Sequence, residues 1–534
     1  MRSNRGKRTA ALAVIAALLA GCAVTPRAAG DDVWSKTSVH AEQARKAMLF
    51  CWRYSQGWLQ FVDPETGLLP RNLARDAFWN AKDCAADNYP FLTLVTLFTD
   101  RRAFEERMPA ILEAEQRLCN RVDRLPDDYD FVTKTFRTSE PDLDALIFGA
   151  SEYVKDGLLP LTEWLGPSPW SERMLGLLDD IWRHGNVHTE VGVLPSASHE
   201  VAGDLMQGYS RCYWMTRNAA YKDRAYLLAS YFLDHHLPTN APKLSMDDHG
   251  CEVINGLSEA YFIAAHEDPD VHARWREPMH AMLDRILEVA RNENGLLYML
   301  IDPVEGKVLN DELTDNWGYD YNAFATVALL DDVDRYREAI EFTLARLPAA
   351  KDYPWENDGA DGIADSLESG LNLINRFPIP EAMEWADHSA ERLLKKQRDT
   401  GVIEGWHGDG NGARTMLMYA MWKTRGAYVE PWRADVAVGA ALDDEGYTCF
   451  EVKADWPWRG RLRFDVPRHA EYFRMPLDYP RLNQFPEWFT ARAESTYLTD
   501  EGNLSGAALR EGLDISITPD KPFRIRLKAA PDAP

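Results

Sequence analysis

Five segments of the chain bring acidic, aromatic, Asn and Gly residues together, at positions 79–88, 246–255, 316–322, 358–368 and 405–414. Carboxyl groups donate and accept protons, and flat aromatic rings stack on the apolar faces of sugars. The last three segments begin 42 and then 47 residues apart, which is about the length of one helical hairpin with its loops. Hairpins that each place one such segment on the same rim would build a ring of carboxylates and aromatic rings. The pattern therefore predicts a sugar-binding cleft.

The segment that begins at residue 358 carries its polar side chains at helical spacing. Asp361, Asp365, Glu368, Asn372 and Asn375 follow steps of four, three, four and three residues, so they lie on one face of a predicted helix. Acids favour the positive N-terminus of a helix, which accounts for Asp361 and partly for Asp365. Glu368 is less well explained in this way and indicates a functional role.

The acids of the other segments are weighed in the same way. Asp83 and Asp87 stand one helical turn apart, and capping of a helix N-terminus accounts for only one of them. Asp320 stands between two Tyr residues, where an acid beside aromatic rings suits a sugar subsite. The predicted catalytic residues are Asp83, His249, Asp320, Asp365 and Glu368.

Further residues of the five segments are predicted to bind the substrate. Aromatic residues at helix starts belong to a hydrophobic core about as often as to a binding site, so both interpretations stand. Arg414 falls in a first helical turn, where a cation opposes the helix dipole and needs an acidic partner such as Asp409 or a substrate carboxylate. The predicted binding residues are Trp79, Asp87, Asn88, Glu252, Trp317, Tyr319, Tyr321, Asn322, Trp406, His407, Asp409 and Arg414.

The metal-binding signals in the sequence are weak. His249 and Glu252 form an i,i+3 pair, but a metal site needs more ligands at such spacing, and no Cys-X-X-Cys pair occurs. We therefore predict neither a metal nor a cofactor. The net charge of −25 disfavours a nucleic-acid partner, which requires a basic surface. The sequence indicates no oligomeric state.

The first residues resemble a bacterial lipoprotein signal. Four basic residues precede an apolar run over 10–20, and the tripeptide Leu-Ala-Gly directly precedes Cys22. The apolar run is too short for a bilayer, which needs about 20 residues. We expect a signal peptide at 1–21, lipidation of Cys22 and a linker at 22–33. Because no Asp follows Cys22, the expected anchor is the outer membrane, with the protein in the periplasm or at the cell surface.

Helical periodicity dominates the chain as far as about residue 427. About fourteen period-3.6 segments occur between residues 40 and 425, with no alternating strand of ordinary length between them. Beyond residue 430, alternating patterns at 435–441, 448–454, 460–466, 513–517 and 523–528 predict strands. We expect a helical catalytic domain at 34–428 and an antiparallel β-sandwich at 429–534.

About fourteen helices followed by a β-sandwich resemble the six-hairpin (α/α)6 toroid superfamily, which includes glycoside hydrolases, unsaturated glucuronyl hydrolases and polysaccharide lyases. The resemblance implies a mainly α fold with an active site at one end of the toroid, where the inner helices begin. It identifies no individual family, and fold alone does not give the reaction.

Three functions remain open from the sequence. A glycoside hydrolase needs one carboxyl group as acid and a second as base or nucleophile, and the five segments offer several. A polysaccharide lyase or a uronyl epimerase would instead use Tyr or His as base and Arg or Asn to neutralise a uronic carboxylate. A non-catalytic glycan-binding lipoprotein needs only the aromatic residues. We predict a hydrolase acting on an oligo- or polysaccharide, with uronic acids among its candidate sugars.

Overall fold

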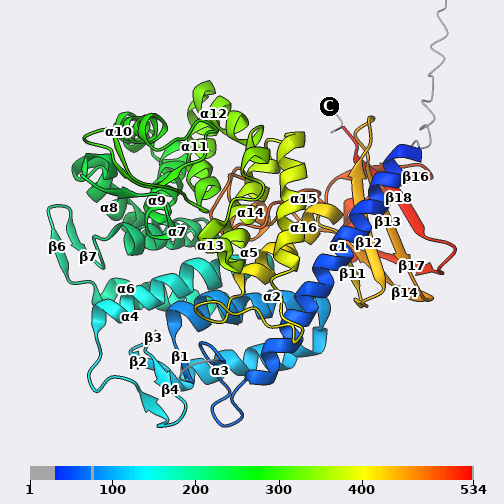
Figure 1. The fold of residues 1–534 in the computed structure, drawn as a ribbon, viewed down its shortest axis with the longest axis horizontal. Helices are drawn as coiled ribbons and strands as arrows, with labels where there is room; N and C mark the ends of the chain where they lie inside the picture. Colours follow the sequence, from blue (N-terminus) through cyan, green and yellow to red (C-terminus); the bar gives the residue numbers. More distant parts are fainter. Residues whose placement is uncertain (1–30, 74–76, 532–534) are drawn as a thin grey trace, which may run out of the picture.

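The computed structural model of the protein describes residues 31–73 and 77–531. The predicted lipidation site Cys22 lies outside these residues and stays a prediction. Helices form the larger part of the molecule, and two antiparallel sheets lie beside them at one end (Figure 1). None of the helices in the described ranges combines the length and the apolar composition needed to span a bilayer.

The helical part is a closed ring with an inner and an outer layer. Each inner segment packs against the next, and the last one, α16, packs back against the first, α2. Within the described residues the inner layer consists of η2 (Ala81–Asn88) with α2 (Tyr89–Thr99), α4 (Leu143–Glu152) with η4 (Tyr153–Leu158) and α5 (Leu159–Leu165), α7 (His199–Thr216), α9 (Asp248–Glu267), α11 (Trp317–Asp331), α14 (Ala360–Ile374) and α16 (Asn411–Thr424).

The outer layer alternates with the inner one along the chain. Its helices are α1 (Asp31–Trp58), α3 (Met108–Leu118), α6 (Pro169–His184), α8 (Ala219–Ser230), α10 (Pro269–Val289), α12 (Asp334–Leu344) and α15 (Pro380–Leu394). Burial follows this division. In α12 the buried residues recur at 336, 339, 340, 343 and 344, which is the single apolar stripe of an amphipathic helix. Inner helix α16 is buried from Asn411 to Met421 without interruption.

The structure confirms a mainly α toroid of helical hairpins followed by antiparallel sheets. Among the described residues the inner layer has seven segments, one more than the name of the six-hairpin superfamily gives. The additional pair arises because the ring begins with an outer helix, α1, and ends with an inner helix, α16, and these two pack against each other.

Two inner segments contain π-helical turns, η2 and η4, which pack against each other. The contact is close: a Cβ on Gly157 would lie 2.8 Å from the carbonyl oxygen of Ala85. A π-turn inserts an extra residue into a helix and redirects the side chains around it, and such turns recur at functional sites. Both π-turns carry acidic residues that face the centre of the ring, described below.

Helices α7 and α9 also pack closely at glycine residues, and their backbones approach more closely than those of η2 and η4. A Cβ on Gly203 would lie 2.3 Å from the carbonyl carbon of Glu252, and one on Gly256 would lie 2.6 Å from the carbonyl oxygen of Gly203. Glycine at both positions lets the two backbones touch, and this contact fixes where the start of α9 stands.

We expect Gly203→Ala to destabilise the fold by about 1–3 kcal/mol, because the added methyl group overpacks the α7–α9 contact. Urea unfolding followed by circular dichroism measures the change. Gly405→Ala is the matched control, since a Cβ at Gly405 meets no atom within 4 Å. Equal losses in the two variants would contradict the close-packing argument.

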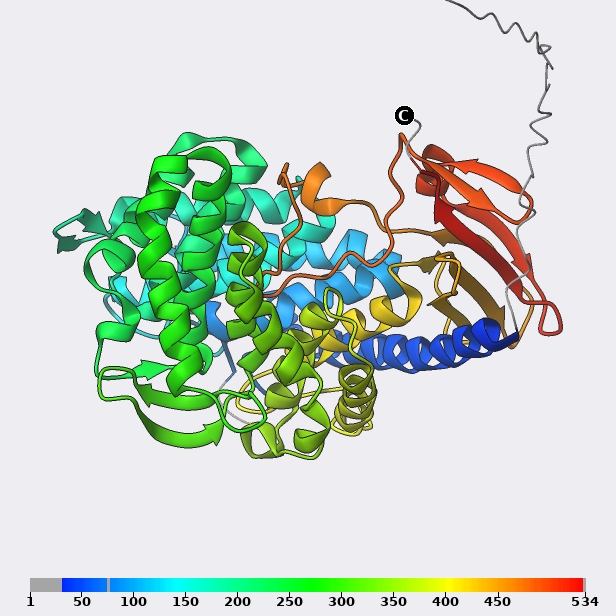
Figure 2. The ribbon, with the colours of Figure 1, turned by 90° about the horizontal axis from the view of Figure 1, so that it is seen from above.

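The C-terminal strands form two facing antiparallel sheets. One sheet has the order β12 (Val436–Leu442), β13 (Thr448–Ala454), β18 (Phe523–Ala529), β15 (Thr496–Thr499), β16 (Gly502–Ser505), and the other has the order β11 (Tyr428–Glu430), β14 (Trp458–Arg463), β17 (Leu513–Ile517). Apolar residues of both sheets, with Phe450 and Ile515 among them, form a core of their own. Helix α1 lies along β12, where Gly439 lets the helix backbone approach closely (Figure 2).

Short strands also occur between the helices, namely β1 (Phe78–Trp79), β2 (Asn120–Val122), β3 (Leu125–Pro126), β4 (Tyr129–Asp130), β5 (Thr135–Phe136), β6 (Val187–Thr189), β7 (Gly192–Leu194), β8 (Leu244–Ser245), β9 (Tyr298–Asp302) and β10 (Lys307–Leu313). The expectation of no strand of ordinary length in this region was wrong for β9 and β10, which form a hairpin. Most residues of β10 are exposed, so it lacks the alternation that marks a half-buried strand.

A loop from the β region returns into the ring. Residues 478–485, here called the axial segment, lie between β14 and β15 in sequence but reach the centre of the helical layer (Figure 2). Arg211 of α7 donates to the carbonyl oxygen of Leu482 at 2.9 Å, and Arg481 pairs with Glu163 of α5 at 3.1 Å. Tyr479 donates to Glu259 of α9 at 3.1 Å. The axial segment is therefore held by at least three inner helices.

Candidate active site

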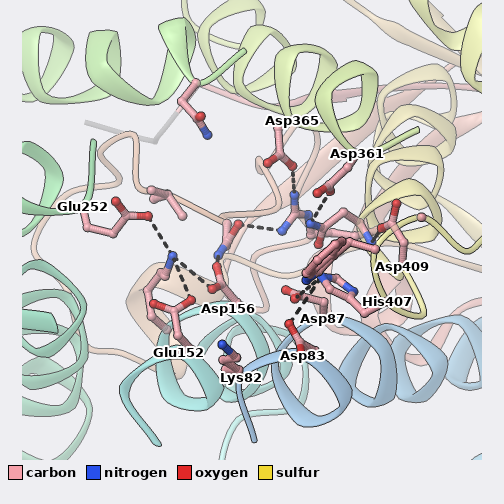
Figure 3. Close-up of a pocket in the computed structure, with 18 of the residues that line it drawn as sticks. Lys82, Asp83, Asp87, Glu152, Asp156, Glu252, Asp361, Asp365, His407 and Asp409 are labelled. Carbon is pink, nitrogen blue, oxygen red and sulfur yellow. Dashed lines mark hydrogen bonds and ion pairs between the residues drawn. The ribbon is translucent and has the colours of Figure 1, made fainter. Parts of the chain in front are cut away.

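A cavity of about 540 Å³ opens at the end of the ring where the inner segments begin, a size within the ~300–1,000 Å³ typical of small-molecule sites (Figure 3). Leu482 and Asn483 of the axial segment line it together with the starts of the inner segments. Most of the other lining side chains are charged. The acidic ones are Asp83, Asp87, Glu152, Asp156, Glu200, Glu252, Glu356, Asp361, Asp365 and Asp409, and the basic ones are Lys82, Lys155, His407 and Arg414.

The first cluster joins η2 to the loop before α16. Asn80 caps η2 by accepting a hydrogen bond from the backbone N–H of Cys84, which leaves Asp83 and Asp87 one turn apart. His407 Nε2 lies 3.4 Å from Asp87 Oδ2 and 3.7 Å from Asp83 Oδ1. Asp83 also pairs with Arg71. This cluster therefore holds two acids against one imidazole.

The protonation of this cluster follows from burial and mutual attraction. Burial disfavours the imidazolium of His407, but Asp87 and Asp83 outweigh it and raise its pKa to about 9. Burial alone would raise the pKa of Asp83, yet His407, Asn80 and Arg71 lower it. Burial raises the pKa of Asp87 well above its usual range, although His407 opposes this. His407 is therefore a cation at neutral pH.

Asp409 stands beside this cluster and lies close to Asp361. It is 3 % exposed and accepts a hydrogen bond from the backbone N–H of Asn411 at 2.9 Å. Burial, followed by repulsion from Asp361, raises the pKa of Asp409 to about 7. Asp361 in turn accepts a hydrogen bond from the Asn411 amide at 2.8 Å. Asp409 is a carboxyl group that is protonated near neutral pH.

Arg414 is enclosed by acceptors. Its guanidinium lies 2.7 Å from Asp365 and 2.5 Å from Glu368, and it donates to Asn483 at 2.9 Å. Tyr319 donates its hydroxyl to Glu368 at 2.6 Å. Burial raises the pKa of Glu368, with Arg414 opposing. The acidic partner that the sequence demanded for Arg414 is thus Asp365 with Glu368, and Glu368 acts behind the cavity wall, not in it.

Lys155 of η4 occupies the other side of the cavity. Its ammonium lies 2.9 Å from Glu252, 3.0 Å from Asp156, 3.8 Å from Asp204 and 3.9 Å from Glu152. Burial raises the pKa of Asp204 to about 6 and that of Glu152 well above its usual range. One cation therefore lies among four carboxyl groups, and the raised pKa of Glu152 favours its protonated form.

The aromatic residues divide into two kinds. Trp406 is 68 % exposed, lines the cavity and stacks its ring 5.5 Å from the Arg71 guanidinium. Trp79 and Trp317 are buried, and the Trp317 indole donates to Ser366 at 3.0 Å. Only Trp406 among these three is placed to stack on a sugar.

The structure brings nine of the predicted site residues to the cavity. They are Asp83, Asp87, Glu252, Tyr319, Asp365, Trp406, His407, Asp409 and Arg414. The side chain of His249 lies outside the described residues, although α9 begins one residue before it.

Seven predicted site residues do not line the cavity, namely Trp79, Asn88, Trp317, Asp320, Tyr321, Asn322 and Glu368. All are buried in the ring wall. Tyr321 donates to the carbonyl oxygen of Gly295 at 2.7 Å, and Asn88 accepts from Tyr54 at 2.6 Å. Successive helical residues point about 100° apart, so Tyr319 faces the cavity and Asp320 does not. For the segment at 316–322 the prediction did not separate the faces of the helix.

Asp320 is the clearest of these corrections. It is fully buried, and neither carboxyl oxygen has a hydrogen-bond partner among the described residues. Burial raises its pKa well above the usual range. A buried acid without a partner is neutral at pH 7, so Asp320 cannot serve as the ionised group of an acid–base pair in this cavity.

Several cavity residues were not predicted. Glu152, Lys155 and Asp156 interrupt an apolar run over 146–161, and charges inside such a run are themselves a signal of a polar interior. Asn483 donates to Asp156 at 2.7 Å across 327 residues of sequence, and no local pattern marks it.

Comparison with known proteins does not place the chain in a family. No protein-family profile and no curated protein sequence matches it. Its fold is similar to the GH76A α-1,6-mannanase from Salegentibacter sp. HEL1_6, at 14 % identity over 58 % of this chain and 96 % of the mannanase, with a TM-score of 0.40. The corresponding values for the cellobiose 2-epimerase from Spirochaeta thermophila DSM 6192 are 13 %, 73 %, 97 % and 0.39. At these values the matches assign no reaction.

Proposed function

We propose that the protein is a carbohydrate-active enzyme that hydrolyses glycosidic bonds by general acid–base catalysis. The observation that carries the proposal is the pair Asp83 and Asp409, two buried carboxyl groups that line one cavity beside the imidazolium of His407, the first with a lowered pKa and the second with a raised pKa. Glycoside hydrolysis needs one carboxylic acid to protonate the leaving oxygen and one carboxylate to activate water or attack the sugar.

The surroundings divide the two roles. The negative neighbour of Asp409, Asp361, favours its protonated form, so Asp409 is the general acid. Although burial opposes it, His407, Asn80 and Arg71 lower the pKa of Asp83, so Asp83 is the ionised carboxylate of the cluster and the base or nucleophile. Trp406 provides a ring on which the sugar stacks. Because the axial segment closes the inner end, we expect the cavity to take one end of a glycan chain.

Three of the groups that a lyase or epimerase would use, all within the described residues, are already engaged. Tyr319 donates its proton to Glu368, and His407, with a pKa of about 9, is a cation and not a base. Arg414 is paired with Asp365 and Glu368 and is not available to neutralise a uronic carboxylate. These contacts favour hydrolysis over elimination.

Incubation with neutral, amino-sugar and uronic-acid glycans tests the proposal. Hydrolysis releases new reducing ends without the ultraviolet absorbance of a conjugated double bond. A rise in that absorbance would identify a lyase and overturn the hydrolase assignment. Binding without turnover of any glycan in the panel would leave a glycan-binding protein.

The activity is expected to fall on both sides of neutral pH. Above about pH 7 Asp409 loses the proton that the leaving oxygen needs, and at acidic pH Asp83 takes up a proton and ceases to act as base. A profile of kcat/KM against pH measures both limbs. Activity that stays constant from pH 6 to pH 9 would contradict the assignment of Asp409.

Trp406→Ala is expected to raise KM about threefold to tenfold with kcat unchanged, because it removes ring stacking worth roughly 0.5–1.5 kcal/mol from ground state and transition state alike. Steady-state kinetics separate the two constants. Trp456→Ala is the control, since Trp456 is 70 % exposed on the β region and lines no part of the cavity. Equal changes in the two variants would remove Trp406 from the binding site.

A further inference from the structure

The cavity contains more acids than its bases can neutralise. Among the described residues, ten acidic side chains line it, and three of the four basic ones already lie among carboxylates. Lys155 lies near three of the lining acids, Arg414 is paired with one, and His407 faces Asp83 and Asp87. The fourth, Lys82, is exposed and faces the Phe148 ring at 5.5 Å. The interior of the cavity is therefore negative.

The protein relieves this charge by holding protons. Burial raises the pKa of Asp409 to about 7 and raises that of Asp87 and Glu152 well above their usual range. Each of these protons neutralises a carboxylate whose charge the basic side chains do not fully neutralise. A cationic ligand would take over this role and release protons to solvent as it binds.

A buried hydrogen-bond acceptor without a donor also favours a cationic ligand. Asn411 lines the cavity and is 8 % exposed, and its amide nitrogen donates to Asp361, which fixes the orientation of the amide. Its Oδ1 has no hydrogen-bond partner within the part of the chain that the structure describes. A buried acceptor without a donor is costly, so a ligand that brings donors is favoured here. An ammonium group brings three donors and no acceptor.

We infer that the cavity binds a sugar with a free, protonated amine, such as a de-N-acetylated hexosamine at the end of a glycan. The choice of a sugar as the ligand rests on the proposed function. The positive charge of the ligand is argued from the cavity alone. A uronic acid would add a carboxylate to a negative interior, where Lys82 is the one basic side chain of the described lining that is not already among carboxylates. An N-acetylated sugar would bring an amide, with no charge and one donor, in place of the ammonium.

A metal ion fits the same acids less well. One oxygen each of Asp83 and Asp87 and one nitrogen of His407 lie within 4.8 Å of one another. Imidazole must be neutral to bind a metal, whereas these two acids hold His407 protonated and Arg71 already pairs with Asp83. A proton on His407 therefore fills the place that a metal ion would take.

Isothermal titration at pH 6.5 with glucosamine, N-acetylglucosamine, glucose and glucuronate tests the inference. We expect glucosamine to bind at least about tenfold more tightly than the other three, as one charge-assisted contact to a buried acid provides. Its binding heat should change with the ionisation enthalpy of the buffer, which reports proton release. Equal affinities, a preference for glucuronate or the absence of binding would each overturn the inference.

Two variants and one ion sharpen the test. Asp361→Asn keeps an acceptor for Asn411 but removes a charge, so the preference for glucosamine over glucose should fall several-fold while glucose binding is retained. Asp399→Asn, at an exposed acid away from the cavity, should leave the preference unchanged. Calcium chloride should not displace glucosamine; displacement would identify a metal site and overturn the inference.

The inference and the proposed function fail separately. Selective glucosamine binding without hydrolysis of amino-sugar glycans would leave the inference standing and remove the hydrolase. Hydrolysis of neutral glycans with no preference for the amine would do the reverse.

Discussion

Asp409→Asn is expected to lower kcat/KM by about 10²–10⁴-fold and, at the same time, to stabilise the fold above pH 7. The loss of activity follows because an amide keeps the shape and the hydrogen bond to the Asn411 backbone but has no proton to give to the leaving oxygen. Steady-state kinetics on the glycan that the wild-type protein turns over measures the first effect.

The gain in stability follows from the sign of the pKa shift. The carboxyl of Asp409 has an ordinary pKa of 3.8, and burial with repulsion from Asp361 raises it to about 7 in the folded protein. Between about pH 4 and pH 7 the folded state holds a proton that the unfolded state has lost. The free energy of unfolding therefore falls as pH rises through this window and stays lower above it. Asparagine does not ionise, so the variant avoids this loss of unfolding free energy. A pKa shift of this size corresponds to about 2–4 kcal/mol.

Thermal unfolding of wild type and variant at pH 5 and pH 8 measures the second effect. The variant should gain most at pH 8 and least at pH 5, where the wild-type carboxyl is already protonated. Asp399→Asn should change neither quantity, because Asp399 is exposed. Full activity in Asp409→Asn would exclude Asp409 as the acid. An unchanged unfolding temperature at pH 8 would show that the carboxyl ionises in the fold without cost.

Arg414→Met is expected to cost about 3–5 kcal/mol of unfolding free energy, the range for removing one partner of a buried ion pair. Arg414 is 2 % exposed and lies against Asp365, Glu368 and Asn483. Without it, Glu368 becomes a fully buried carboxylate with only the Tyr319 hydroxyl to support it. Urea unfolding at pH 7 measures the loss.

A double variant isolates the cause of that loss. Glu368→Gln in the Arg414→Met background removes the unpaired charge and should restore part of the stability. Arg102→Met is the control, because the Arg102 side chain is 84 % exposed and an ion pair in solvent, such as its pair with Glu106, contributes little to stability. A loss at Arg414 no larger than that at Arg102 would show that the ion pair does not support the cavity wall.

Local sequence patterns were sufficient to predict the fold class and most of the helices and C-terminal strands. The 3.6-residue periods marked the helices of both layers, and the alternating patterns after residue 430 marked β12, β13, β14, β17 and β18. These signals are local because an apolar stripe is fixed by neighbours within two turns. Six hairpins were expected and seven inner segments are found among the described residues. Local patterns could not give this number, because how many hairpins close a ring depends on contacts between helices far apart in sequence.

The candidate site was predictable only in outline. Clusters of polar residues at helix starts located the rim, but which residue faces inward depends on the rotation of each helix, as Tyr319 and Asp320 show. Charged residues that interrupt an apolar run, such as Lys155, indicate a polar interior. The prediction missed them because it searched for segments rich in acidic and aromatic residues. Asn483 had none, because its role arises only when a distant loop meets the ring.

Because the axial segment lines the cavity, the cavity is complete only after residues 478–485 have been synthesised. A ribosome has produced every inner helix before residue 478 exists, and at that stage the ring lacks its floor and Asp156 and Arg414 lack Asn483. A product that stops before this point would be a tube open at both ends, not a blind pocket. If the protein has the proposed activity, we expect that activity only in a chain whose synthesis has passed the axial segment.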